Sequence, residues 1–154
     1  MSILKTKIDY TLFEKYDKEY FIENKIVPIY EDSISLKIAI CSSSNIEKIK
    51  DNFIKIINFI EEKEHDILFI LANIEKRVNL HKSALKSISS NDDEKFTSYF
   101  LDELILYSIE QRASDIHIEK YQDLCLFKFR VDGRLRIFFS FDEELFRVFS
   151  SFVK

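Results

Sequence analysis

Residues 34–40 alternate between apolar side chains and polar or small ones. One set of alternate positions is apolar, namely Ile34, Leu36, Ile38 and Ile40. Because successive side chains of a strand point to opposite faces, this alternation predicts a β-strand with one buried face. The preceding apolar segment, residues 26–30, contains Pro28, and proline in a strand favours an edge position. We therefore expect two neighbouring strands, with residues 34–41 central in the sheet.

Spacings of three and four between apolar residues predict helices around these strands. Residues 8–25 fit one or two polar helices. Ser44 and Glu47 match a capping box, in which each side chain accepts a hydrogen bond from the other residue's backbone N–H. The helix that they predict continues along a stripe of apolar residues: Ile46, Ile49, Phe53, Ile56, Ile57 and Ile60. A short buried strand over 67–71 and a helix over 74–88 complete a small α/β lobe.

The polar segment 87–94 (SISSNDDE) predicts the boundary between this lobe, residues 1–90, and a second lobe, residues 91–154. The second lobe begins with an amphipathic helix that ends near Arg112. Three strands are expected over 114–120, 124–131 and 134–139, and a last helix begins near Phe141. That helix has no capping residue before Lys154, which predicts that the chain is part of a longer protein. The second lobe is thus expected to be α+β, with an antiparallel hairpin.

Asp132 and Gly133 lie between the last two predicted strands and indicate the turn of that hairpin. A two-residue loop would pair Val131 with Arg134 and would mix phenylalanine with arginine on each face. A three-residue loop separates the apolar face from the charged face, so we predict the three-residue loop. It places four cations in a row on one face: Lys128, Arg130, Arg134 and Arg136.

Like charges that face each other on a sheet destabilise it unless an opposite charge is near. In one interpretation the cations form ion pairs within the chain. Alternate positions of the neighbouring predicted strand hold two acidic residues with a histidine between them: Asp115, His117 and Glu119. The other interpretation is an anion, either a phosphate or a carboxylate from another domain, since arginine presents a planar fork to such groups. Both interpretations remain open at the level of the sequence.

Composition excludes several classes of protein. Hydrophobic residues make up 46% and charged residues 32%, with a net charge of −4, which is typical of a globular chain and not of a nucleic-acid-binding one. No apolar run approaches the roughly 20 residues of a membrane helix, and the charged N-terminal segment does not resemble a secretory signal. We therefore expect a cytoplasmic location, with Cys41 and Cys125 reduced inside the core.

Gly133 is the only glycine of the 154 residues. A phosphate-binding P-loop needs two glycines and a dinucleotide fingerprint needs three, because backbone amides must approach phosphate oxygens closely. The three histidines, His65, His81 and His117, are scattered without zinc-ligand spacing. The chain is therefore expected to have no catalytic residues and no metal, and as it stands it cannot turn over a nucleotide.

Two motifs carry a resemblance to a known family. Residues 101–119 read LDELILYSIEQRASDIHIE, and residues 124–135 read LCLFKFRVDGRL. Together they resemble the signature of the N-terminal region of type II secretion and type IV pilus assembly ATPases, in which a helix runs into an ASDIHIE segment and an Arg-x-Arg-hydrophobic-Asp-Gly hairpin follows. The matching residues are Ala113, Ser114, Asp115, Ile116, His117, Ile118, Glu119, Arg130, Asp132 and Gly133. Lys128 stands where the family has its first arginine, and Lys120 where it has a proline.

The resemblance covers residues 96–154 well and residues 1–90 loosely. It implies a hexameric motor, with ATP and magnesium bound by a C-terminal half that is outside this chain. Residues 1–90 would be a docking domain for the cytoplasmic part of an inner-membrane platform protein, and residues 91–154 an incomplete PAS-like domain. Arg130, Lys128 and Arg134 would approach the nucleotide phosphates when the domains close. The parent motor could serve secretion, pilus assembly or DNA uptake.

Two functions of different class follow. The first is the non-catalytic docking and nucleotide-sensing segment of such a motor, peripheral to the inner membrane and without nucleic acid as a partner. The second is a free-standing PAS-like module that binds a small anion. The unterminated last helix favours the first.

Overall fold

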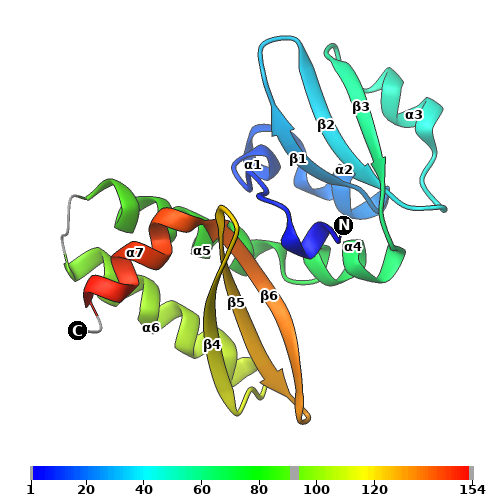
Figure 1. Ribbon diagram of the computed structural model, residues 1–154. Helices are drawn as coiled ribbons and strands as arrows, with labels where there is room; N and C mark the ends of the chain where they lie inside the picture. The colour runs from blue at the N-terminus through cyan, green and yellow to red at the C-terminus, as the bar shows by residue number, and fades with distance from the viewer. Residues whose placement is uncertain (1, 91–93, 153–154) are drawn as a thin grey trace. The chain divides into compact units, whose positions relative to one another are not determined.

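The computed structural model describes residues 2–90 and 94–152 of the chain, which has an α+β fold (Figure 1). It divides into two compact units, Met1–Ile74 and Glu75–Lys154. The predicted boundary lies further along, at 87–94, and it differs from this division because the helix over 74–89 packs with the second unit. Asn91, Asp92 and Asp93 of the predicted boundary lie outside the described residues. No described helix has the length and apolarity to cross a membrane.

The first unit is a three-stranded mixed sheet with short helices. Its strands are β1 (Val27–Glu31), β2 (Ser35–Ile40) and β3 (Ile56–Glu61), in the order β1-β2-β3. β1 pairs antiparallel with β2, and β3 pairs parallel with β2. The helical segments are η1 (Ile3–Lys5), α1 (Leu12–Lys15), α2 (Lys18–Glu23), α3 (Ile46–Asp51) and α4 (Glu64–Leu71).

The strands predicted over 26–30 and 34–41 are confirmed, with β1 at an edge and β2 in the centre. Leu36, Ile38 and Ile40 are buried as the alternation predicts, whereas Ile34 precedes the strand and is exposed. Phe13 and Phe21 from the predicted N-terminal helices are also buried, and their rings meet edge to face at 5.3 Å. This apolar layer forms the core of the first unit.

The predicted helix over 46–60 is wrong beyond Asp51. α3 ends there, and residues 56–61 form β3 instead. β-branched residues are favoured in strands, and the run Ile56-Ile57 followed by Phe59-Ile60 finds the edge of β2 as a pairing partner. The capping box is also wrong. Asn45 caps α3 by accepting from the N–H of Lys48, while the Ser44 hydroxyl accepts from the N–H of Cys41.

The predicted strand over 67–71 is a helix, α4. A short apolar run fits a buried strand and a buried helix equally well by pattern. Glu64 and Asp66 in its first turn favour the helix, since negative charge interacts well with a helix N-terminus. Ile67, Ile70 and Leu71 are buried at spacings of three and four.

The second unit packs helices on an antiparallel sheet. Its helices are α5 (Ile74–Ser89), α6 (Glu94–Glu110) and α7 (Glu143–Phe152), and its strands are β4 (Asp115–Tyr121), β5 (Leu124–Val131) and β6 (Arg134–Asp142), in the order β4-β5-β6. These elements confirm the helices and strands predicted for this part of the chain. Residues 153 and 154, where the last helix was expected to continue, lie outside the described residues.

Aromatic rings fill the core of the second unit. Phe100 of α6 contacts Phe127 of β5 at 5.7 Å between ring centroids and Phe149 of α7 at 5.5 Å. Arg77 of α5 is buried in the same core, with its guanidinium 4.9 Å from the centre of the Phe139 ring and a hydrogen bond to the carbonyl of Phe138. Stacking on a ring lets a guanidinium be buried together with its charge.

Candidate functional site

The residues of the ASDIHIE segment begin where α6 ends. Arg112 has a φ of 57°, and the N–H groups of Arg112 and Ala113 bind the carbonyls of Ile109 and Ser108. This is a Schellman motif, which closes the helix and turns the chain into β4. Ser114 then donates its N–H to the carbonyl of Arg130 at 2.9 Å, which starts the pairing of β4 with β5.

The two predicted motifs lie side by side on these strands. Asp115 pairs with Arg130, and His117 pairs with Lys128. Directly paired residues of an antiparallel sheet have their side chains on the same face, so the acidic and cationic residues share one surface. The sequence placed the two motifs on neighbouring strands, and the register now shows which residues meet.

The hairpin has a two-residue loop, so the predicted three-residue loop is wrong. Val131 pairs with Arg134, and the loop residues Asp132 and Gly133 both have positive φ, 50° and 74°. Positive φ at both positions is characteristic of a type I′ turn, whose twist matches that of the flanking strands. The mixed faces remain next to the turn, and the register shifts only further along the hairpin, between Phe127 and Lys128.

The predicted row of four cations on one face is also wrong, because the register splits it. Lys128 pairs with Ile137 and Arg130 pairs with Leu135, so these two cations share a face. Arg136 pairs with Phe129, and Arg134 pairs with Val131, which places both on the opposite face near the hairpin tip. The candidate site on the ASDIHIE face therefore contains two hairpin cations.

Both of these cations contact carboxylates of β4. Nε of Arg130 lies 3.3 Å from Oδ2 of Asp115, and the ammonium of Lys128 forms an ion pair with Glu119. His117 contacts the other oxygen of Asp115. The hydroxyl of Ser114, the ring of His117 and the charge of Arg130 hold the pKa of Asp115 below its usual value. This arrangement is the internal, salt-bridged face that the sequence allowed as one of two interpretations.

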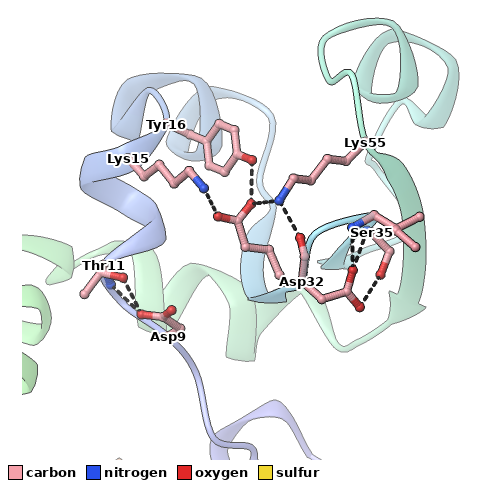
Figure 2. A network of polar contacts seen from close by, with 9 residues as sticks. Asp9, Thr11, Lys15, Tyr16, Asp32, Ser35 and Lys55 are labelled. Carbon is pink, nitrogen blue, oxygen red and sulfur yellow. Dashed lines mark hydrogen bonds and ion pairs between the residues drawn. The ribbon is translucent and has the colours of Figure 1, made fainter.

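A second polar cluster, missed by the sequence analysis, lies in the first unit. Lys15, Tyr16 and Lys55 converge on one carboxylate, that of Glu31 (Figure 2). The Tyr16 hydroxyl donates at 2.7 Å and the Lys55 ammonium at 2.9 Å. Burial of the carboxyl opposes its ionisation, but the three donors hold the pKa of Glu31 at about 2.

The Glu31 cluster ties three elements of the first unit together. Lys15 and Tyr16 lie at the end of α1, Glu31 ends β1, and Lys55 precedes β3. In the same region Asp32 accepts hydrogen bonds from the N–H groups of Ile34 and Ser35 and so shapes the turn into β2 (Figure 2). No spacing in the sequence indicates this cluster, because its members are separated along the chain and meet only through the sheet.

The described residues contain no group of three metal-ligating side chains, and Cys41 and Cys125 are buried and free. No protein-family model and no curated protein sequence matches the chain.

Proposed function

We propose that this chain is the non-catalytic N-terminal region of a hexameric cytoplasmic ATPase that powers type II secretion or type IV pilus assembly. In this proposal the first unit docks to the cytoplasmic part of an inner-membrane platform protein, and the second unit helps to sense the nucleotide. ATP and magnesium bind to the remainder of the motor. Because the first unit docks to the platform protein, the chain lies at the inner membrane as a peripheral component.

The observation that carries the proposal is the pairing of Asp115 with Arg130. Family-like motifs that are separated in the sequence meet on adjacent strands, with the ASDIHIE segment beside the Arg-hydrophobic-Asp-Gly hairpin. β4 and β5 are consecutive strands of one hairpin, and their register sets Asp115 opposite Arg130 and His117 opposite Lys128. This register supports a single functional surface formed by both motifs.

Arg130 is the side chain that we expect to reach a phosphate. Its side chain is 38% exposed and that of Asp115 is 43% exposed, so the ion pair is open to solvent and easily exchanged. A phosphate offers the guanidinium a bidentate contact that can replace one carboxylate oxygen. Lys128 is less accessible, with 20% of its side chain exposed, and its ammonium lacks the planar fork.

A free-standing module for a small anion is the less favoured function. Lys128 and Arg130 already contact Glu119 and Asp115, so a small anion would compete with two local carboxylates. In a motor, the free energy of domain closure can offset the cost of replacing a carboxylate contact by a phosphate contact. A free module has no such domain closure.

The coding sequence that follows residue 154 tests the proposal directly. We expect it to continue in frame and to encode a GxxxxGK[ST] segment, the P-loop that a chain with one glycine lacks. A stop codon after Lys154 would contradict the motor. A second test is calorimetry of this chain with ATP and magnesium, where we expect a dissociation constant no tighter than about 1 mM because the hairpin offers charge but no amide cradle.

A further inference from the structure

β3 is an edge strand that contains no proline and pairs regularly with β2. It is the outermost strand of its sheet beyond β2 (Figure 1). None of its six side chains is buried. β1, at the other edge, is interrupted at Pro28 by a register shift, and the N–H of Asp9 binds the carbonyl of Ile29 there at 2.9 Å. Proline, irregular pairing and covering segments block edge-to-edge association. Within the described sheet, the proline and the irregular pairing are in β1.

The exposed edge of β3 has a defined set of backbone groups. Ile56 donates its N–H to Ile34 and Glu62 donates to Ile40, so the even-numbered residues of β3 bond towards β2. Backbone groups alternate in direction along a strand. The N–H and C=O groups of Ile57, Phe59 and Glu61 therefore point away from the sheet.

The sequence of this strand is complementary to itself when it is reversed. Residues 55–61 read KIINFIE. In an antiparallel pair centred on Asn58, Lys55 faces Glu61, Ile56 faces Ile60, and Ile57 faces Phe59. The charged ends meet with opposite sign, and the apolar residues meet apolar residues. This register also pairs odd-numbered residues with odd-numbered ones, so the outward backbone groups meet each other.

We propose that β3 pairs antiparallel with β3 of a second copy of this chain, about a two-fold axis at Asn58. The interface is isologous, because each copy presents the same strand. Exposed apolar side chains at the start of the strand, Ile54 and Ile56, become partly covered by the partner. One strand pair buries less area than a standard interface of roughly 1,600 Å², so the dimer is weak and reversible. This inference is independent of the proposed motor function.

The ion pair with Glu31 does not prevent this arrangement. Lys55 contacts Glu31 and the carbonyl of Asp32. Lys55 and Glu61 occupy positions of the same parity, so both lie on the Glu31 face of the sheet. The Lys55 ammonium keeps these contacts, and its positive charge on the same face attracts the Glu61 carboxylate of the second copy at longer range.

Charge reversal tests the register. In sedimentation equilibrium of the whole chain we expect a concentration-dependent dimer, and Glu61→Lys should raise its dissociation constant at least about tenfold, because two Lys–Glu contacts become Lys–Lys contacts. Glu23→Lys, an equal charge change at an exposed position of α2, is the matched control and should leave dimerisation unchanged.

A disulfide tests the axis. Asn58→Cys places two thiols opposite each other at a non-hydrogen-bonded pair, where Cα atoms lie about 4.5 Å apart, within disulfide reach. Oxidation should give a covalent dimer. Lys37 pairs with Asn58 on the neighbouring strand and is also exposed, so Lys37→Cys is the control and should not cross-link. The proposal is overturned by a monomer at all concentrations, by a dimer unaffected by Glu61→Lys, or by equal cross-linking of the two cysteine variants.

Discussion

Arg130 and Asp115 face each other across β4 and β5, with 3.3 Å between Nε and Oδ2. Each residue belongs to a different motif of the sequence, and the strand register brings them together. The contact lies on a partly exposed face, where an ion pair contributes little to folding but determines which way a guanidinium points. The ion pair with Asp115 therefore orients Arg130, the arginine most relevant to the proposed motor, along the β4–β5 face.

Arg130→Ala in the full-length protein should lower ATP turnover at least about tenfold, or roughly 1.4 kcal/mol of transition-state stabilisation. The thermal midpoint should change little, because the pair with Asp115 is exposed to solvent. Arg147→Ala is the matched control, since Arg147 is an exposed arginine of α7 in an ion pair with Glu144. Turnover and midpoint should be measured on the same samples. Normal turnover with a lowered midpoint would show that Arg130 serves only the salt-bridged face.

Glu31→Gln should destabilise the first unit by roughly 2–3 kcal/mol. The change keeps the shape of the side chain but removes the charge that Lys15 and Lys55 share, at a position only 12% exposed. Glu23→Gln, at an exposed position, should cost far less. Urea unfolding followed by circular dichroism measures both. Equal stability of the two variants would mean that the Glu31 cluster adds nothing to the fold.

The same cluster predicts the pH dependence of stability at both extremes. The pKa of Glu31 is lowered to about 2, so its contribution is complete above about pH 5 and is lost as the pH falls towards 2. Burial and the hydrogen bond to Glu31 raise the pKa of Tyr16 to about 12, so its contribution is present below pH 10 and is lost as the pH rises towards 12.

Thermal midpoints across pH, compared between the wild type and Tyr16→Phe, measure this effect. The wild type should lose stability between pH 10 and 12 as the Tyr16 phenol ionises. Tyr16→Phe should not show this part of the loss. An unchanged alkaline profile in Tyr16→Phe would assign that loss of stability to other groups.

Gly133→Ala should destabilise the hairpin by about 1 kcal/mol. Gly133 has a φ of 74°, where a side chain is strained, although an added Cβ would meet no atom within 4 Å. The cost is therefore one of backbone conformation alone. Asp132→Asn, which keeps a residue that tolerates positive φ, should be nearly neutral. If Gly133→Ala is as stable as Asp132→Asn in urea unfolding, the turn is not type I′.

The sequence by itself determined the elements that have a clear apolar periodicity or a specific turn signal. The alternation through Leu36 and Ile38 specifies a strand, because only a period of two buries both. Phe100, Leu104 and Tyr107 are spaced by three to four residues, which places them on one face of a helix, so this stripe specifies a helix. Asp132-Gly133 marks a turn wherever it lies. Local stereochemistry decides each of these features, and no distant contact is needed.

The tertiary structure decided the rest. Ile56 and Ile60 fit a helical stripe and a strand equally well, and only the open edge of β2 made them a strand, while the opposite outcome held for Ile67 and Leu71. The separation of Arg134 and Arg136 from Lys128 and Arg130 depends on strand twist, which favoured the tight turn over the register with cleaner faces. The convergence on Glu31 depends on which strands pair. In each case the outcome depends on the interaction free energy with a segment that is distant along the chain. A local sequence pattern cannot indicate such an interaction.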